Sequence, residues 1–484
     1  MRNATVSSPW KNLILVILPL ITIMIAYAIA KTGTKTGVFF IASMIAASLT
    51  IVALFFPTFG FYYTIISTFF LFDIKRMVDI DIPLGTFIDL LIIITFVGII
   101  IKKIIRKESF WKHCDHLIVY AYGISFLYSS IEIFNPNAAS RELVLVIFRR
   151  FLTLQLFLYC SIQLFSDLES IKRFFKIFFF MCVLAGMYGC YQEWFGYPKY
   201  ELDYIFSSPL LMGLYSLDNG NYRKFSSLSD PTSFGILMAA MALIAMILLR
   251  TVKKNLRMIL AGIGILFLLL SMGYSGTRTA YAIFVAGLVL YIMMTITNRN
   301  TLIFATIAFI GFVVIIFGPI HGNATINRIR TTFEFSDDAS YQVRDDNRAA
   351  VQPYLRSHPI GGGIGSTGVL NMEQNANHPL AGFPTDSGFL RAGLELGWIG
   401  LIIQCILYFI VVQQGIRAYY ATRDPFKRAI LLACTVSLFS YIVAHYAQIA
   451  IGPMPGSFLF YGLIGVIVRA SQMKDENLIE TNNI

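Results

Sequence analysis

Residues 258–319 decide the fold of this chain, because they hold three long apolar blocks in close succession. The blocks read MILAGIGILFLLLSMGY at 258–274, TAYAIFVAGLVLYIMMTIT at 279–297 and TLIFATIAFIGFVVIIFGP at 301–319. A helix needs about 20 residues to cross the hydrocarbon of a bilayer. Backbone polar groups need internal hydrogen-bond partners in lipid, so only helices or the strands of a closed barrel can span it. Barrel strands would be half as long and would alternate apolar with polar residues, so these blocks must be helices.

Similar blocks recur along the whole chain, whose 484 residues are 57% hydrophobic and only 13% charged. We therefore predict an all-α polytopic membrane protein with about 12–14 transmembrane helices. The third block is short enough to be re-entrant, and Pro57 before it marks either a kink or a turn. The first is interpreted as a retained span, not a signal peptide. The predicted spans are 12–30, 38–56, 59–73, 85–101, 117–135, 143–165, 174–195, 231–249, 258–274, 279–297, 301–319, 395–416, 427–446 and 452–469.

Lysine and arginine are unevenly divided between the two sets of loops, and this bias predicts the orientation. One set, with the two tails, holds 21 of these residues, and the short loops of the opposite set hold nine. Both termini are therefore expected in the cytoplasm, and one large periplasmic or extracellular loop is expected at 321–391. The same division explains the net charge of +11 without nucleic-acid binding.

Neither a disulfide framework nor a metal site is predicted. Five of the six cysteines lie in apolar blocks, where cysteine behaves as a small hydrophobe. The run His113-Cys114-Asp115-His116 is too compressed for tetrahedral metal ligation. The outer-loop sequence GIGSTG at 363–368 matches a dinucleotide fingerprint but lacks the strand before it and the acidic residue after it. The glycines at 361–365 instead predict a tight turn or a close approach to a ligand.

Several short motifs occur in a fixed order between residues 222 and 415. They are SDPTSFG at 229–235, SGTRTA at 275–280, Arg344 followed by HPIGGGIG at 358–365, TDSGFL at 385–390 and ELGWIG at 395–400. In this order, on a multispan protein with one large outer loop, they resemble the O-antigen ligase and O-antigen polymerase superfamily of bacterial surface-polysaccharide enzymes. We accordingly divide the chain into N-terminal transmembrane helices (1–221), a ligase-like core (222–415) and C-terminal helices with a cytoplasmic tail (416–484).

The resemblance implies a glycosyltransferase of the bacterial inner membrane. Its donor would be a glycan on undecaprenyl diphosphate, and its reaction would invert the anomeric carbon without a metal or other cofactor. In the lipid A-core ligases of this superfamily a histidine followed by asparagine stands where this chain has Asp386-Ser387. The difference favours a polymerase of O-antigen or exopolysaccharide repeat units over a ligase that moves finished glycan to a lipid or protein. Besides the lipid-linked glycan and the bilayer, expected partners are a chain-length regulator and a flippase.

The implied chemistry needs cations that stabilise a departing diphosphate and a base for the acceptor hydroxyl. Arg278 and Arg344 are the predicted cations, and Asp386 is the predicted base. A cation near a helix N-terminus opposes the helix dipole, so Arg278 is expected there for a ligand. The alternative, purely structural functions are contact with lipid headgroups for Arg278 and helix capping for Asp386. Asp230-Pro231 is expected to cap the helix at 231–249.

Five further residues are predicted to bind substrate. Arg149 and Arg150 lie inside the span 143–165, where ionised groups are costly and usually functional, unless that span begins later. Arg348 follows Arg344 by one helical turn, although the neighbouring aspartates can explain both as surface ion pairs. His358 and His378 are the alternative bases. A transporter would need ionisable residues in several spans, and a scaffold protein would tolerate loss of the outer arginines.

Overall fold

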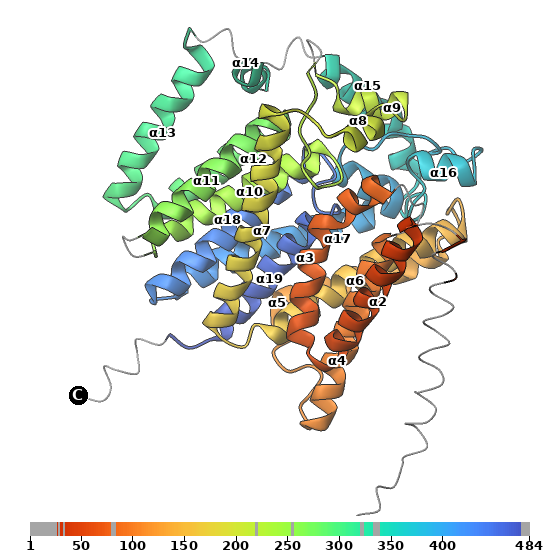
Figure 1. The fold of residues 1–484 in the computed structure, drawn as a ribbon, viewed down its shortest axis with the longest axis horizontal. Coiled ribbons are helices and arrows are strands. Elements are labelled where there is room, and N and C mark those ends of the chain that lie inside the picture. The colour runs from red at the N-terminus through yellow and green to blue at the C-terminus, as the bar shows by residue number, and fades with distance from the viewer. Residues whose placement is uncertain are drawn as a thin grey trace, which may run out of the picture.

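The computed structural model describes residue 27 and residues 30–31, 34–78, 84–217, 221–252, 256–319, 324–332 and 339–475. Almost all of the predicted first span at 12–30 lies outside these ranges. Across them the chain forms helices and no named strand, which confirms the all-α class (Figure 1). Within the same ranges, nine helices are long and apolar enough to cross a membrane, which confirms a polytopic membrane protein.

Each predicted span from the second onward coincides with a long helix. These helices are α2 (Thr34–Phe55), α3 (Pro57–Val78), α4 (Leu84–Ile105), α5 (Leu117–Ile131), α6 (Arg141–Leu164), α7 (Leu168–Trp194), α10 (Pro231–Leu249), α11 (Leu256–Tyr274), α12 (Arg278–Thr295), α13 (Arg299–Phe317), α17 (Gly388–Ala421), α18 (Pro425–Ala447) and α19 (Gly456–Gln472). The third span is not short: α3 has 22 residues, and its last turn carries Lys75 and Arg76. Only Phe56 separates the end of α2 at Phe55 from the start of α3 at Pro57, and Figure 1 shows the two helices running side by side, so Pro57 marks a turn.

The short helices gather at one end of the bundle, which we call the loop end (Figure 1). They are α8 (Lys199–Ile205), α9 (Pro209–Tyr215), α14 (Ala324–Thr331), α15 (Ala339–Ser357), α16 (Val369–Gln374) and the 3-10 turn η1 (Glu132–Phe134). The opposite end, which we call the basic end, carries the lysine- and arginine-rich connections around 102–112, 250–257 and 417–428. The helices alternate in direction between these two ends, as the predicted spans require.

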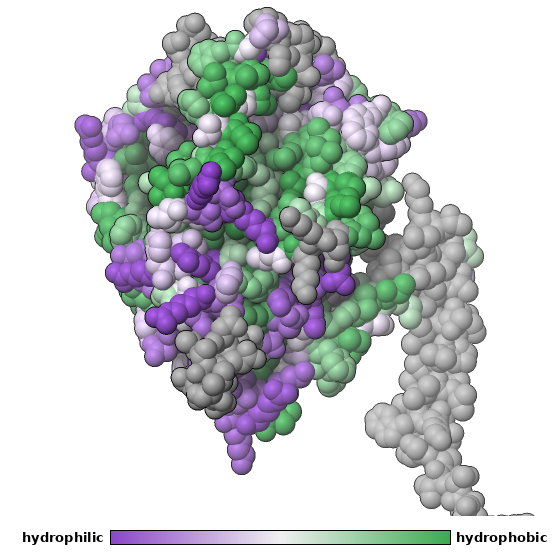
Figure 2. All heavy atoms as spheres, turned by 90° about the vertical axis from the view of Figure 1, so that its left-hand side faces the viewer, coloured by the Kyte–Doolittle hydropathy of each residue, from purple (hydrophilic) through white to green (hydrophobic). Residues whose placement is uncertain are grey.

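Helices α10 and α18 lie at the centre of the bundle, and α13 lies at its edge. Along their most apolar 18 residues, 67% of α10 and 72% of α18 are buried, against 6% of α13. Figure 2 shows the side that carries α13, with hydrophobic side chains over much of its upper half and hydrophilic ones gathered lower down. Exposed apolar surface of this extent suits lipid and not water. The long helices therefore have the surface of membrane spans.

Helix α17 is interrupted at Gly397, where φ is +68°. The interruption receives the glycine-rich segment of the outer loop: a Cβ on Gly397 would lie 2.0 Å from the carbonyl oxygen of Pro359, and one on Gly361 (φ +72°) would lie 2.5 Å from the amide nitrogen of Gly397. The amide of Gly362 donates to the carbonyl of Leu394 at 2.8 Å. The predicted tight turn is confirmed, and the close approach is to the protein's own backbone.

Replacing Gly397 with alanine is expected to lower the melting temperature of the purified protein markedly. Gly397 has φ +68° and ψ −170°, a backbone conformation that costs a residue with a Cβ about 1–3 kcal/mol, and the clash with Pro359 adds to this cost. Gly196→Ala is the matched control, because Gly196 has φ +86° but no atom within 4 Å of the added Cβ. Thermal melts in detergent compare the two variants. Equal losses of melting temperature would contradict the close packing at the α17 interruption.

Candidate functional site

Helices α10, α12 and α18 begin or end together at the loop end. The hydroxyl of Thr277 donates to the carbonyl of Pro231 at 3.0 Å, which joins the start of α12 to the start of α10. Helix α12 contacts α18 at Gly287, whose added Cβ would lie 2.5 Å from Ser440 Oγ. A helix rises about 1.5 Å per residue. The start of α12 and the final turn of α18 therefore lie at the same end of the bundle and at similar heights.

Three arginines converge on the turn between α11 and α12. Arg278 is the first residue of α12 and is half-buried. The guanidinium of Arg223 donates to the Thr277 hydroxyl at 2.9 Å and to the Ser275 carbonyl at 3.2 Å. The guanidinium of Arg328, on α14, donates to the Gly276 carbonyl at 2.6 Å.

This arginine cluster (Arg223, Arg278 and Arg328) holds concentrated positive charge at the loop end. Burial, together with the charge of Arg328, lowers the pKa of Arg223 to about 10, so Arg223 is still a cation at neutral pH. The sequence singles out Arg278 only. Arg223 and Arg328 come from separate segments of the chain, and no local motif links either of them to the turn.

The start of α10 is a plain helix cap, as predicted. The carboxylate of Asp230 accepts from the amide of Ser233 at 2.8 Å and from its hydroxyl at 2.6 Å. Pro231 occupies the first turn, where a missing amide hydrogen does no harm. The SDPTSFG motif therefore caps the start of α10, which lies beside the arginine cluster.

Asp386 does not cap α17. The capping residue is Ser387, whose hydroxyl accepts from the amide of Leu390 at 3.3 Å. Both carboxylate oxygens of Asp386 are buried from solvent. Because the capping function belongs to its neighbour, the capping alternative for Asp386 is wrong, and a catalytic function for this carboxylate stays a prediction.

A histidine that the sequence does not single out lies beside this start of α17. His445, near the end of α18, is 6% exposed, and an added Cβ on Gly388 would lie 2.0 Å from its ring. The rings of Phe389 and Tyr408 pack around it with centroids 5.5 and 5.9 Å away. Its Nδ1 is buried with no hydrogen-bond partner in the part of the chain that the structure describes. In the sequence His445 lies at the end of an apolar block and belongs to no motif, so the sequence alone does not mark it as a site residue.

Arg348 reaches the same corner of the loop end from α15. Its guanidinium donates to the hydroxyl of Tyr446 at 3.3 Å and lies 4.8 Å from the centre of that ring. Arg344 lies one turn earlier on α15, but its side chain lies outside the described part of the chain. Helix α15 is held over the start of α17 by an apolar cluster that includes Val351, Leu355 and Leu394. Arg348 therefore lies close to the segment that follows Asp386.

The two outer-loop histidines have structural contacts instead. Nδ1 of His378 accepts from the amide of Leu380 at 3.1 Å, and Nε2 lies 3.1 Å from the carbonyl oxygen of Asn137. This arrangement leaves neither nitrogen of His378 with an available lone pair. The ring of His358 stacks on Tyr354 with a centroid separation of 3.9 Å at the end of α15. The contacts of His378 therefore argue against it as the base, whereas stacking leaves the ring nitrogens of His358 open to this function, which stays a prediction.

Arg149 and Arg150 share one buried carboxylate within the bundle. Asp89 of α4, whose side chain is 3% exposed, lies 3.1 Å from Arg149 Nε and 3.3 Å from Arg150 Nη1. The hydroxyl of Thr153 donates to the same carboxylate at 2.9 Å. A paired charge costs much less at this depth than an isolated one, so the depth of the two arginines has a structural explanation. A substrate contact by either stays a prediction.

Arg150 also faces a cavity of about 270 Å³ between α5, α6, α17 and α18. The cavity reaches the underside of the α17 start, since Gly388 and His445 line it as well. Most of the remaining lining is apolar, apart from Arg391 and Glu395, which pair at 2.9 Å. This cavity is mostly apolar, contains a few charged groups and lies next to the start of α17, which follows Asp386. Such a lining suits a ligand with both an apolar and a polar part.

Comparison with known proteins finds a family match that covers part of the candidate site at the loop end. Residues 263–405 match the family described as O-antigen ligase. The match runs from α11 into α17 and contains Arg278, Arg328, Arg348 and Asp386, whereas Arg223 and His445 lie outside it. No curated protein matches the chain.

Proposed function

We propose that this protein, whose residues 263–405 match the family described as O-antigen ligase, polymerises undecaprenyl-diphosphate-linked oligosaccharide repeat units. The polymer would be an O-antigen or an exopolysaccharide. The loop end would face outward from the bacterial inner membrane, with both termini in the cytoplasm, as the excess of lysine and arginine at the basic end favours. The observation that carries the proposal is the arginine cluster at the same end as Asp386.

The proposed reaction is a single displacement at the anomeric carbon of the donor glycan. The hydroxyl of the acceptor sugar loses its proton to the Asp386 carboxylate while its oxygen bonds to the anomeric carbon. The bond from that carbon to the diphosphate oxygen breaks on the opposite face, so the configuration inverts. Guanidinium groups of the arginine cluster, with Arg344 and Arg348, bind the diphosphate as its negative charge grows. No covalent intermediate is required, and the residues named supply all the groups that this step needs.

The second candidate is a ligase that transfers finished glycan to a lipid or protein acceptor. The description of the matching family favours it, and the donor chemistry would be the same. Asp386 favours the polymerase, because the lipid A-core ligases of the superfamily have a histidine followed by asparagine where this chain has Asp386-Ser387. A chain-length regulator and a flippase of the same pathway are proposed as partners of either activity.

Glycan profiling of a deletion strain tests the proposal and separates the two candidates. Loss of a polymerase is expected to leave single repeat units on the final acceptor, and the full-length gene should restore long chains. Polymer that remains on the lipid carrier would instead identify a ligase. An unchanged glycan profile in the deletion strain would contradict both activities.

A further inference from the structure

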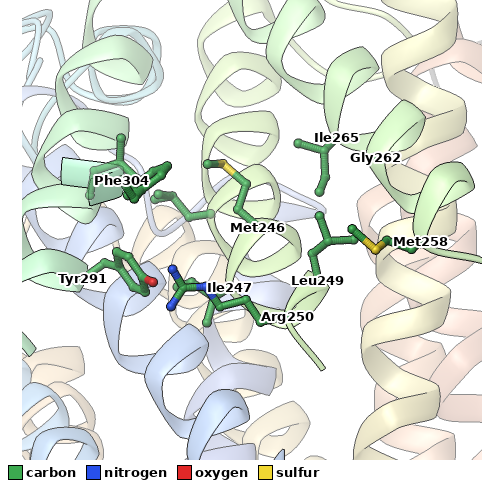
Figure 3. Close-up of a pocket in the computed structure, with 11 residues that line it drawn as sticks. Met246, Ile247, Leu249, Arg250, Met258, Gly262, Ile265, Tyr291 and Phe304 are labelled. Carbon is green, nitrogen blue, oxygen red and sulfur yellow. The ribbon is translucent and has the colours of Figure 1, made fainter. Parts of the chain in front are cut away.

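A second cavity lies at the basic end, far from the arginine cluster. Its volume is about 370 Å³, and α10, α11, α12 and α13 surround it (Figure 3). The lining is almost wholly apolar, with Met246, Ile247, Met258, Ile265 and Phe304 among its members. Because α13 packs loosely at the edge of the bundle, the cavity lies next to the surrounding lipid.

Two polar groups lie together at one side of this cavity. The guanidinium of Arg250, the residue that caps the end of α10, lies 5.3 Å from the centre of the Tyr291 ring. Figure 3 shows the guanidinium and the Tyr291 hydroxyl pointing toward each other. Tyr291 is 4% exposed, and its hydroxyl is buried without a hydrogen-bond partner in the described residues. A buried donor of this kind is destabilising if it stays unsatisfied.

Arg250 is exposed to the outside of the bundle, and no carboxylate pairs with it in the part of the chain that the structure describes. A cation at the rim of an apolar cavity matches a ligand with an anionic head and an apolar tail. Basic pockets between transmembrane helices on the cytoplasmic side are typical sites for anionic lipid headgroups. The lipid-linked donor of the proposed reaction does not fit here, because its diphosphate belongs at the loop end.

We propose that this cavity binds one acyl chain of an anionic phospholipid, whose phosphate contacts Arg250 and accepts a hydrogen bond from Tyr291. The apolar lining excludes water from around the chain, and chain burial supplies a favourable free energy. The headgroup phosphate supplies an anion for the Arg250 guanidinium and a hydrogen-bond acceptor for the Tyr291 hydroxyl. The site is independent of glycosyl transfer and would hold the loosely packed α13 against α10 and α12.

The test compares phosphatidylglycerol with phosphatidylcholine, added to the purified full-length protein in detergent, by native mass spectrometry and thermal melts. Phosphatidylglycerol should bind and raise the melting temperature more than phosphatidylcholine does. Arg250→Gln should weaken phosphatidylglycerol binding about tenfold, whereas Arg250→Lys should keep most of the preference. Arg299→Gln is the control, because Arg299 is an exposed arginine at the same end that does not line the cavity.

Gly262→Leu tests the apolar part of the site separately. Gly262 lines the cavity, and an added Cβ there meets no atom within 4 Å, so a larger side chain starts in open space. This variant should bind neither lipid at the site while melting normally without lipid. Equal phosphatidylglycerol binding by the wild type and Arg250→Gln, or undiminished binding by Gly262→Leu, would overturn the proposal.

Discussion

Arg278→Ala is expected to abolish long-chain glycan in a complemented deletion strain while protein levels remain normal. In the proposed reaction this guanidinium stabilises charge that develops on the leaving diphosphate, and removal of one such preorganised donor typically slows a reaction by about 10²–10³. Arg278→Lys should recover only part of the activity, because an ammonium keeps the charge but cannot bind two phosphate oxygens in a planar fork.

The control for Arg278→Ala is Arg141→Ala. Arg141 is also the first residue of a long helix at the loop end, and it is exposed. A general effect of removing a surface cation from a helix start would appear in both variants, whereas a diphosphate contact would appear only at Arg278. Long-chain glycan of normal length and amount from Arg278→Ala would refute the assignment.

Asp386→Asn is expected to remove at least as much activity, with a loss of about 10²–10⁴. Asparagine keeps the size and shape of aspartate but cannot accept the proton of the acceptor hydroxyl at neutral pH. Folding should be unaffected, since Ser387 and not Asp386 caps α17. Glycan profiles and immunoblots of the complemented strain measure the two effects separately.

Asp230→Asn provides the same chemical change at the same end of the bundle. Asparagine caps helices as well as aspartate does, so this variant should retain long-chain glycan. If Asp386→Asn also retained it, the base would lie elsewhere. Loss of polymer in His358→Gln alone would then transfer the function to His358, whose ring stacks on Tyr354 and whose Nδ1 lies 2.9 Å from the Ser357 hydroxyl.

The helices were predictable because a bilayer imposes one length and one composition on every span. Where the sequence was ambiguous, a local feature decided the structure: Pro57 starts a new helix after a tight turn, and the polar last turn of α3 shortened its apolar block without shortening the helix. The interruption of α17 was not predictable from composition. It depends on a glycine segment that reaches Gly397 from far along the chain.

The candidate site was predictable only where a residue is unusual for its own surroundings. Arg278 opposes the dipole of its helix, and Arg149 and Arg150 lie too deep in a span, so all three are visible in the sequence. The partner that Arg149 and Arg150 share is not visible in the sequence, because Asp89 lies 61 residues before Arg150 in a block that is otherwise apolar. Arg223, Arg328 and His445 are ordinary in their own segments and become unusual only when the fold brings them to the loop end.

The fit between Gly361 and Gly397 also limits how the substrates of the proposed reaction could enter and leave. A segment whose backbone atoms lie against another backbone without intervening side chains has no spare volume in which to swing. Asn135 and Asn137 fasten the same segment from the other side, through carbonyls of Ile360 and Gly361 at 2.8 and 2.9 Å. Residues 360–362 are therefore held rigidly. Any movement of the protein that admits a bulky glycan must involve a different stretch of the loop end.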